Sequence, residues 1–458
     1  MTSLAVLILA AGQGTRMCSS RPKVLHELAG WPLLRHVLHG VAPLNPEKII
    51  VVTGHQAQQV EAAFPDSGIS WIRQVEQNGT GDAVRCALPA LQGFTGNLLI
   101  LSGDTPLIKT ETLRGFVDLH HEEDRALSLL SMTLDDPTGY GRIIRDGGGG
   151  LREVVEQKDA NGTVQQITEV NSGIYCVAID RIGGWLAAIT NHNAQGEYYL
   201  PDIIPMAVKE GVGAAYHHSD SGSLLGINTR KQLAQLEVVF RDRQVERFME
   251  AGVGFIDPSS CWLAPDCQIG QDTIIQPNVI LGVGVVIGAG CQIGPFCEIR
   301  QSQIGPGTII KAFSHLEGAQ TAGPNEIGPY ARLRFGSVLE AKAKVGNFCE
   351  LKKAHIGVGS KVNHLSYIGD TEMGEGVNVG AGTITCNYDG VNKHKTTIGD
   401  RVFIGSGTQL VAPVTLEDQV MIAAGSTVTM DVPADSLALS RVKQQIVSEW
   451  SRLRKSKF

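Results

Sequence analysis

The sequence predicts an α/β domain with a mainly parallel sheet, a long connecting helix and a solenoid of short repeats. In the first half, apolar runs of strand length alternate with segments of helical pattern. Residues 229–251 then contain neither Gly nor Pro and are rich in helix formers. In the second half a hydrophobic residue returns at every sixth position, a period that belongs neither to a helix nor to a half-buried strand.

Length and composition narrow the class of protein. The chain has 458 residues, a net charge of −7 and 43% hydrophobic residues, which suits two or three globular domains. No long basic run occurs before the last few residues, so nucleic acid is not expected as a partner. The apolar segment 5–11 is too short for a signal peptide and lacks a preceding basic region, and no segment is long enough to span a membrane. We therefore expect a cytosolic protein.

The first domain is expected over residues 1–228, with a Rossmann-like alternation of strands and helices. Segments 6–10, 49–53, 98–102 and 127–132 have the composition of strands, and segments 33–39 and 81–91 have a helical pattern. A linker helix is expected over 229–252, and its segment 229–251 would be about 33 Å long at 1.5 Å per residue. The repeats occupy 253–437, and 438–458 form a basic C-terminal tail.

The hydrophobic positions of the repeat run in two main series. They are Leu263, Ile269, Ile275, Leu281, Ile287, Ile293 and Ile299, then Ile398, Ile404, Leu410, Leu416, Ile422 and Val428. The pattern resembles the hexapeptide repeat of left-handed parallel β-helices, in which three units close a triangular coil, and it implies about nine coils. Residues 386–397 interrupt the repeat and predict a projecting loop, either a tolerated insertion or a binding element.

Four cysteines fall four positions after a repeat hydrophobe. They are Cys267, Cys291, Cys297 and Cys349. The same position elsewhere holds small residues such as Thr273, Thr308 and Ser360. We therefore interpret these cysteines as packing residues rather than as ligands of a metal or partners in disulfides.

The N-terminal domain opens with a Gly-rich turn after its first strand. Residues 9–17 read LAAGQGTRM, and Pro22-Lys23 follow. Such a turn exposes backbone N–H groups that bind phosphate. The chain lacks a Walker Gly-Lys-Ser/Thr here, and the second strand ends without an acidic residue, which argues against kinase-like and dinucleotide-binding sites. The whole stretch resembles the signature of nucleotidylyltransferases that join a sugar 1-phosphate to a nucleoside triphosphate.

Further motifs agree with this resemblance in kind and order. They lie at residues 74–83, 101–107, 137–142, 155–159, 171–173 and 226–228. Taken singly, Asp104 is equally well a helix cap, Glu156 a surface charge and Asn171 a turn residue. Taken jointly and in order, the motifs favour the nucleotidylyltransferase interpretation.

The repeat domain carries a second set of motifs, at residues 328–334, 345–353, 363–370 and 380–390. With both halves in this order, the chain resembles, along nearly its entire length, the family of bacterial bifunctional N-acetylglucosamine-1-phosphate uridylyltransferase/glucosamine-1-phosphate acetyltransferases. The resemblance implies that acetyl-CoA acetylates glucosamine 1-phosphate in the C-terminal domain. It further implies that UTP then converts the product to UDP-N-acetylglucosamine, a precursor of peptidoglycan and lipopolysaccharide, in a Mg²⁺-dependent homotrimer.

The resemblance also implies a role for individual residues. The nucleotide and sugar of the uridylyltransferase site are assigned to Leu9, Ala10, Ala11, Gly12, Lys23, Gln74, Gly79, Thr80, Ser102, Gly103, Asp104, Gly141, Glu156, Asn171 and Asn228. Arg16 and Lys23 are its catalytic cations, and Asp104 and Asn228 are its metal ligands. The amino-sugar phosphate is assigned to Arg334, Lys352, Tyr367, Asn378 and Lys393, and acetyl-CoA to Ala381, Asn387, Tyr388, Ser406, Ala424 and Arg441.

Elementary chemistry supports the acetyltransferase assignments. An amine that attacks a thioester needs a base, and His364 is the candidate because a neutral imidazole is suited to that task near pH 7. His355 lacks the surrounding motif and is expected to be structural. Arg334 and Lys352 follow repeat hydrophobes, at a position otherwise rich in Gly, and suit a phosphate.

Three positions depart from the family pattern, and the tail leaves two alternatives. Ser102 replaces an aromatic residue, Asp82 a His and Phe335 a Pro, from which we expect altered fine contacts with activity kept. Apart from Arg441, the basic tail forms either a solvated helix or a contact with coenzyme A phosphates.

Two rival hypotheses for the whole chain are a nucleotidylyltransferase whose β-helix serves only assembly or regulation, and a regulatory homologue with inactive sites. The presence of Arg16, Lys23, Asp104 and His364 argues against both.

Overall fold

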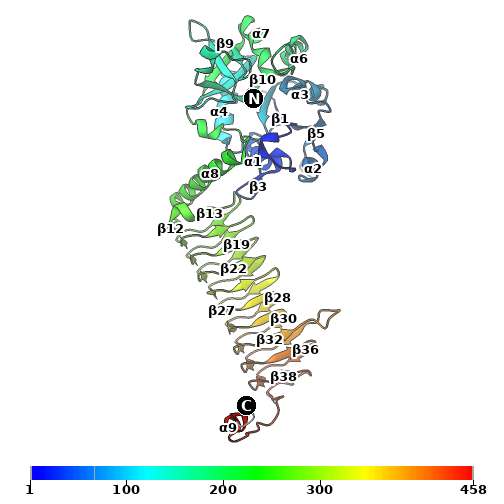
Figure 1. Ribbon diagram of the computed structural model, residues 1–458, viewed down its shortest axis with the longest axis vertical. Coiled ribbons are helices and arrows are strands. Elements are labelled where there is room, and N and C mark those ends of the chain that lie inside the picture. The colour runs from blue at the N-terminus through cyan, green and yellow to red at the C-terminus, as the bar shows by residue number, and fades with distance from the viewer. Residues whose placement is uncertain (1–2, 66–67, 456–458) are drawn as a thin grey trace. The chain divides into compact units, whose positions relative to one another are not determined.

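The computed structural model describes residues 3–65 and 68–455, which form two compact units divided between Phe240 and Arg241. The first unit is an α/β domain and the second is a solenoid of short strands (Figure 1). The division lies inside α8 (Arg230–Glu250), the helix that the sequence predicts over 229–252. Among the described residues, none of the helices combines the length and apolar character needed to cross a membrane.

The sheet of the first unit has the strand order β11-β7-β10-β6-β1-β4-β5. These strands are β1 (Leu4–Ala10), β4 (Lys48–Thr53), β5 (Ser70–Arg73), β6 (Asn97–Ser102), β7 (Leu127–Thr133), β10 (Glu169–Ala178) and β11 (Gly213–His217). β1 pairs in parallel with β4 and β6, whereas β10 is antiparallel to both of its neighbours. A hairpin of β8 (Arg142–Arg145) and β9 (Leu151–Val155) pairs with β10. The sheet is therefore mainly parallel, as the sequence predicts.

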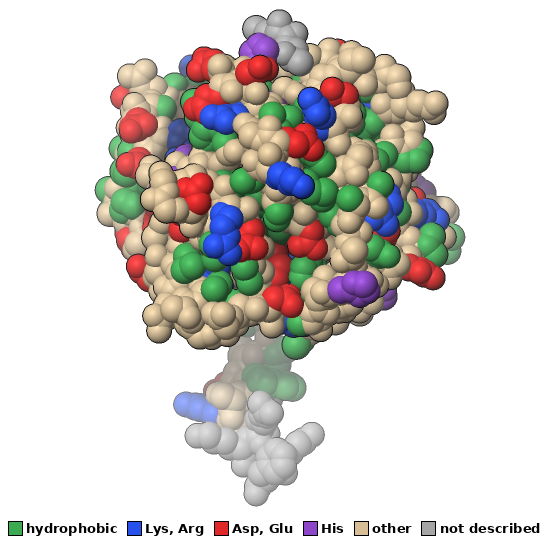
Figure 2. All heavy atoms as spheres, turned by 90° about the horizontal axis from the view of Figure 1, so that it is seen from above, with side chains coloured by type: hydrophobic (Ala, Val, Ile, Leu, Met, Phe, Trp, Pro, Cys, Tyr) green, Lys and Arg blue, Asp and Glu red, His purple; other side chains and the backbone are tan. Residues whose placement is uncertain are grey.

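Helices cover both faces of this sheet. Because side chains alternate along a strand, Ala5 and Leu7 of β1 enter one hydrophobic cluster, and Val6 and Ile8 enter another. The first cluster includes α3 (Thr80–Ala87), α6 (Ile179–Ala188) and α7 (Ile204–Lys209), and the second includes α1 (Leu33–Val41), α2 (Ala57–Ala62) and α4 (Thr110–Glu122). The helix expected over 81–91 ends at Ala87 and continues as a 3₁₀ turn that contains Pro89, a residue without an N–H to donate. Acidic and basic side chains are interspersed on the face of this unit in Figure 2.

The second unit is a parallel β-helix in which every strand pairs with strands one coil away. One sheet consists of β12 (Gly254–Phe255), β15 (Ile274–Ile275), β18 (Gln292–Ile293), β21 (Ile309–Ile310), β24 (Glu326–Ile327), β27 (Lys344–Asn347), β29 (Lys361–His364), β31 (Asn378–Val379), β34 (Phe403–Ile404), β37 (Met421–Ile422) and β39 (Leu437–Ala438). The other faces share a sheet of β13 (Trp262–Leu263), β14 (Gln268–Ile269), β16 (Ile280–Leu281), β17 (Val286–Ile287), β19 (Glu298–Arg300), β20 (Gln303–Ile304), β22 (His315–Glu317), β23 (Ala319–Thr321), β25 (Arg332–Leu333), β26 (Ser337–Leu339), β28 (Glu350–Ile356), β30 (Tyr367–Met373), β32 (Ile384–Cys386), β33 (Thr396–Ile398), β35 (Gln409–Val411), β36 (Val414–Leu416) and β38 (Thr427–Val428).

The hydrophobic residues of the repeat stack in the interior. Ile275 pairs with Ile293 and Ile293 with Ile310, so a slip of one residue in the sequence period shortens a coil without breaking the stack. The predicted packing role of the four cysteines agrees with their burial, since Cys267, Cys291, Cys297 and Cys349 are all buried free thiols. Cys297 Sγ, for example, donates to the carbonyl of Lys311 at 3.2 Å, on the next coil.

The interruption of the repeat is a projecting loop, visible between β32 and β33 in Figure 1. A single bridge between Tyr388 and Lys393 closes it, and Tyr388 and Val391 are exposed.

The C-terminal tail differs from a continuous solvated helix: the only helix among its described residues is α9 (Trp450–Lys455), and Arg441 lies in a segment without regular structure. Val442 and Ile446 of that segment are exposed, so it lacks the packing that stabilises most short helices.

Candidate active sites

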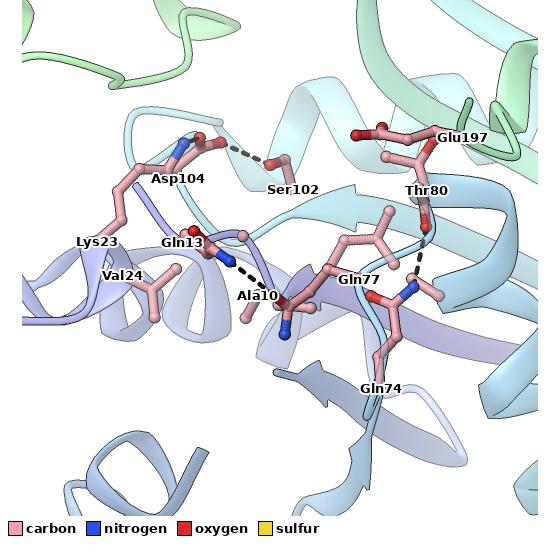
Figure 3. Close-up of a pocket in the computed structure, with 15 residues that line it drawn as sticks. Ala10, Gln13, Lys23, Val24, Gln74, Gln77, Thr80, Ser102, Asp104 and Glu197 are labelled. Atoms are coloured by element: carbon pink, nitrogen blue, oxygen red, sulfur yellow. Dashed lines mark hydrogen bonds and ion pairs between the residues drawn. The ribbon is translucent and has the colours of Figure 1, made fainter. Parts of the chain in front are cut away.

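A cavity of about 480 Å³ opens at the carboxyl ends of β1 and β6 (Figure 3). Loops that follow neighbouring parallel strands meet at this edge, which is where α/β sheets bind ligands. Its walls are Leu9, Ala10, Ala11, Gly12, Gln13, Lys23, Val24, Gln74, Gln77, Gly79, Thr80, Ala83, Ser102, Asp104 and Glu197. The structure thus brings together ten of the residues that the sequence assigns to the nucleotide and sugar.

Five wall residues were not among the sequence-predicted set: Gln13, Val24, Gln77, Ala83 and Glu197. Gln13 and Gln77 belong to the motifs of the sequence, and Gln13 Nε2 donates to Gln77 Oε1 at 3.1 Å across the cavity (Figure 3). This pair was within reach of sequence reasoning. Glu197 comes from a loop after α6 that carries no recognisable motif, so only the folded chain reveals it.

The four residues predicted to act on phosphate and metal form one hydrogen-bonded network. Lys23 Nζ makes an ion pair with Asp104 Oδ2 and donates to Asn228 Oδ1 at 2.9 Å. Arg16 donates to the same Asn228 oxygen at 3.0 Å, and Ser102 Oγ donates to Asp104 Oδ1 at 2.6 Å. Asp104 is buried, so its negative charge is poorly screened by water. Ser102, which departs from the family pattern, holds this carboxylate in place.

The donor set of this network fits Mg²⁺. One buried carboxylate oxygen and one amide oxygen converge on a single cation, the Lys23 ammonium. Mg²⁺ is typically held by one or two such protein oxygens and completes its shell with water and substrate phosphates. Asp104 and Asn228 are therefore suited to the metal role that the sequence assigns to them.

The side chain of Gln74, a residue that the resemblance assigns to the nucleotide, is held in a fixed orientation. Its side chain is buried, and Nε2 donates to the carbonyl of Gly79 at 3.0 Å and to Asp82 Oδ2 at 2.8 Å. Both N–H bonds are thus engaged, and Oε1 is oriented as an acceptor. Asp82, the second departure from the family pattern, contributes directly to this orientation.

Gly141, Glu156 and Asn171 are close to one another, and Gly103 lies between the cavity residues Ser102 and Asp104. The Asn171 N–H donates to the Gly141 carbonyl at 2.9 Å, and a Cβ at Gly141 would come within 3.1 Å of Glu156 Oε1. Burial raises the pKa of Glu156, and the neighbouring carboxylates of Asp159 and Asp202 raise it further. The Gly103 N–H donates to the Leu9 carbonyl at 2.9 Å. These contacts leave little room for larger side chains at Gly141.

In the second unit, His364 ends β29 at a corner of the coil and is exposed. Its Nδ1 lies 3.0 Å from Oδ1 of Asn347, the residue aligned with it on the preceding coil. Because an amide oxygen only accepts, we assign the ring proton to Nδ1, which leaves the Nε2 lone pair available as a base. Asn347 lies in a sequence motif, but the sequence did not predict a role for it. Its contact with His364 depends on the number of residues in the coil between them.

The cations predicted to bind phosphate gather on the neighbouring corner. Lys352 lies beside Lys393, whose ammonium lowers the pKa of Lys352, and Arg334 adds to that effect. Arg334 also donates to Glu350 Oε1 at 2.9 Å. Positive charges held this close are stabilised by a bound anion, so the cluster is suited to a phosphate.

The projecting loop is tied to this cluster. Asn387 Nδ2 donates to Asp370, and Tyr388 Oη donates to the carbonyl of Gly390 at 2.5 Å. Tyr367 begins β30 on the same face as Lys352, whereas Asn378 begins β31 on the face that contains β29. Within one chain the residues predicted for the amino sugar are therefore divided between two faces of the β-helix.

Three residues predicted for acetyl-CoA form a column along the His364 corner. The N–H of Gly382 donates to the His364 carbonyl, that of Gly407 to Ala381, and that of Gly425 to Ser406. Ala424 follows on the last of these coils, and Arg441 donates to its carbonyl at 2.7 Å. The side chains of Ala381, Ser406 and Ala424 in this column are all small.

Comparison with known proteins agrees with both halves. Residues 6–140 match the model of the MobA-like NTP transferase domain, and residues 266–301 and 395–429 match that of the bacterial transferase hexapeptide. The chain is 48% identical over 458 residues to the bifunctional protein GlmU of Marinobacter nauticus, with all of both chains covered. It is 51% identical to that of Pseudomonas savastanoi pv. phaseolicola, with 98% of both chains covered, and 50% identical to that of Alkalilimnicola ehrlichii, with 98% and 96% covered.

Identity at this level holds over whole chains, and both domain types occur in the same order. The similarity therefore covers the complete protein and not only its separate motifs. The chain therefore belongs to the family of bacterial bifunctional N-acetylglucosamine-1-phosphate uridylyltransferase/glucosamine-1-phosphate acetyltransferases.

Proposed function

We propose that the two sites described above carry the two reactions of this family in UDP-N-acetylglucosamine synthesis. The β-helix site transfers acetyl from acetyl-CoA to the amine of glucosamine 1-phosphate. The α/β site joins the product to UTP and releases pyrophosphate. The observation that carries the assignment is His364, whose Nδ1 faces Asn347 Oδ1 and whose Nε2 is free to act as a base.

In the β-helix site, the amine nitrogen of glucosamine 1-phosphate attacks the thioester carbonyl, and Nε2 of His364 takes a proton from that amine. The C–N bond forms, the C–S bond breaks, and coenzyme A leaves as the thiol. Arg334, Lys352 and Lys393 hold the sugar phosphate as charge-assisted donors. Asn347 fixes the ring tautomer, which is the role of the residue behind a catalytic His in other acyl transfers.

In the α/β site, an oxygen of the sugar phosphate attacks the α-phosphorus of UTP in line, and the bond to pyrophosphate breaks. Little proton transfer is needed, so the residues act by positioning and by neutralising charge. Lys23 and Arg16 supply positive charge at the network built around Asn228. Mg²⁺, held by Asp104 and Asn228, would supply further charge neutralisation on the triphosphate.

The base and sugar contacts follow from the same geometry. With both Nε2 hydrogens engaged, Gln74 Oε1 accepts from the N3–H of uracil, whereas the N3 of cytosine carries no hydrogen to donate. Glu156, Asn171 and Gly141 surround the sugar, and Glu197 adds a further polar group to the cavity wall.

Two further features belong to the proposal. A homotrimer through the β-helix is supported by the division of the amino-sugar residues between two faces, since residues from two copies then complete one site. A cytosolic location is supported by the free thiols of the described cysteines, which persist in a reducing compartment.

The test is His364→Ala assayed for both half-reactions. We expect acetylation to fall by roughly 1,000-fold because the general base is lost, and uridylylation to stay within about twofold. Acetylation that survives the change, or uridylylation that falls equally, would show that the two sites are assigned wrongly. His355→Ala is the matched control, because His355 also lies on the outer surface of the β-helix and is bonded to Glu340 and Glu372.

A further inference from the structure

Arg142 is a buried arginine directly behind the residues that the sequence assigns to the sugar. It begins β8 and pairs with Val155 of β9 on one side and with Val170 of β10 on the other. Both pairings are antiparallel, so the next position on each of the three segments is a sugar residue: Gly141, Glu156 and Asn171. The rung of the sheet that is centred on Arg142 therefore supports all three.

The guanidinium of Arg142 joins the two segments that flank the sugar residues. Its Nη1 donates to the carbonyl of Tyr140, and its Nη2 donates to Gln157 Oε1 at 2.8 Å. Tyr140 directly precedes Gly141, and Gln157 directly follows Glu156. Because one planar group bonds to both segments, Gly141 and Glu156 cannot shift independently of each other.

The positive charge of Arg142 is enclosed without a bonded carboxylate. The residue is only 1% exposed, and within residues 3–65 and 68–455 no ion pair includes it. Nη2 also reaches the carbonyl of Gln165 at 3.4 Å, whereas Nε has no hydrogen-bond partner among the described residues. The carboxylates that act on the guanidinium through space are Asp136 and Glu156. A buried charge is costly, so its presence behind the sugar residues indicates a task for that charge.

Glu156 is a carboxylate that needs such a cation. The titratable and charged groups that act on it come from its own loop, from the segment between α6 and α7, from β10 and from β8. They are Asp159, Glu197, Tyr199, Asp202, Tyr175 and Arg142. Burial raises the pKa of Glu156 most and the neighbouring carboxylates raise it further, whereas Arg142 lowers it.

We propose that Arg142 is a positioning residue of the sugar site, which holds Gly141 and Glu156 at a fixed separation and keeps the Glu156 carboxylate negatively charged. The inference rests on the proposed function, in which these residues surround the sugar. An ionised carboxylate accepts hydrogen bonds from hydroxyl groups more strongly than a neutral acid does. Arg142 acts on the sugar only through these residues, because its own side chain is buried.

The test is steady-state uridylylation by the full chain, with UTP and N-acetylglucosamine 1-phosphate, between about pH 5.5 and 8.5. Arg142→Met removes the charge and keeps an unbranched side chain. Arg142→Lys keeps the charge but lacks the planar fork that reaches two segments. The matched control is Arg145→Met, because Arg145 lies on the same strand but pairs with Glu169, at 2.6 Å.

We expect Arg142→Met to raise KM for N-acetylglucosamine 1-phosphate by about 10–100-fold near neutral pH, while KM for UTP stays within about threefold. The acidic limb of kcat/KM for the sugar phosphate should move up by about one pH unit, because Glu156 loses its cation. The substrates ionise identically in every assay, so a shift between proteins reports the enzyme. Arg142→Lys should leave the limb in place and recover part of the lost affinity, and Arg145→Met should behave as the unaltered chain does.

Two results would overturn the inference. One is an acidic limb at the same pH in Arg142→Met and in the unaltered chain. The other is an equal rise in KM for both substrates, which would show that Arg142 supports the whole domain rather than the sugar site. An unaltered chain that does not uridylylate N-acetylglucosamine 1-phosphate would instead overturn the proposed function.

A second variant leaves the buried charge in place and does not depend on the folding of Arg142→Met. Gln157→Met removes the amide oxygen that accepts from Arg142 and, at 3.1 Å, from the Gly139 N–H. We expect KM for N-acetylglucosamine 1-phosphate to rise by about fivefold, with the acidic limb unmoved because the cation remains. An unchanged KM in Gln157→Met would contradict the idea that the guanidinium fixes the two segments.

Discussion

The two active sites are built in opposite ways. In the α/β unit, parallel strands end at one edge, so loops distant in the sequence close around a cavity of about 480 Å³ inside one chain. In the β-helix, each residue has its nearest neighbours one coil above and below, and the outer surface is convex. Its predicted site is an exposed strip along a corner and the face beside it. The first architecture encloses a site within one chain, whereas in the second, on the function proposed above, a neighbouring copy completes the site.

The largest expected effect tests the independence of the enclosed site. Asp104→Asn removes the buried charge that pairs with Lys23 and that we propose as a metal ligand, so uridylylation should fall by about 1,000-fold. Acetylation measured on the same preparation should remain within about twofold, because the two sites lie in separate units. A parallel loss of both activities would contradict that independence.

A smaller loss is expected at the open site from Asn347→Ala. Without the acceptor at Nδ1, the His364 ring samples the wrong tautomer and orientation, so kcat for acetylation should fall by about 10–100-fold. KM for glucosamine 1-phosphate should change little, because Asn347 is not among the phosphate-binding cations.

Asn347→Asp is the conservative control, since it retains an acceptor oxygen at the same position. It should recover most of the lost kcat. If KM rises instead, or if Asp fails to restore activity while the protein melts normally, Asn347 acts in another way than by orienting the imidazole.

The same architectural difference explains how far the sequence predicts each site. Asp104 and Asn228 were predicted as partners through the family resemblance, and the folded chain brings both side chains to the Lys23 ammonium. The contact of Asn347 with His364 depends on a coil of a particular length, and slips in the repeat make that length variable. Glu197 comes from a loop whose path is set by packing between α6 and α7, so no local sequence pattern predicts its position in the cavity wall.

The fold itself was largely predictable because both halves repeat a simple period. Alternation of strands and helices predicted the sheet, and the six-residue period predicted the coils. The tail was not predictable in the same way. It is rich in helix formers, yet Val442 and Ile446 remain exposed, and α9 forms only over its end. Local propensity without a packing partner does not decide the structure of so short a segment.

A stability effect of intermediate size is expected near the enclosed site. Burial, with Asp159 adding to it, raises the pKa of Asp202 to about 6. The folded state therefore binds more protons than the unfolded state between about pH 4 and 6, and stability falls as pH rises through that window. Asp202→Asn removes the buried charge and should stabilise the protein by about 1–2 kcal/mol at pH 7.5, after allowance for partial exposure.

Thermal unfolding at two pH values checks this expectation. The stabilisation by Asp202→Asn should be present at pH 7.5 and nearly absent near pH 3, where the carboxyl is largely neutral in both states. An equal gain at both values would mean that the substitution acts through packing and not through charge.

The smallest expected effect concerns the outer surface of the β-helix. His355 joins three coils, with Nε2 3.0 Å from Glu340 and Nδ1 2.7 Å from Glu372, which also pairs with Lys395. The hydrogen bond with Glu340, and then that with Glu372, raises the pKa of His355 above its ordinary value. Its contribution to stability is therefore complete below about pH 6.5 and is lost as pH rises through the folded-state pKa.

Because His355 is partly exposed, His355→Gln should cost only about 0.5 kcal/mol at pH 5.5 and almost nothing at pH 8.5. Unfolding in denaturant at both values measures this difference. A cost that is the same at both would show that uncharged hydrogen bonds, rather than the imidazolium, link the coils. A cost of several kcal/mol would contradict the broader comparison, since stability in the β-helix would then depend on its convex surface rather than on the apolar stack in its interior.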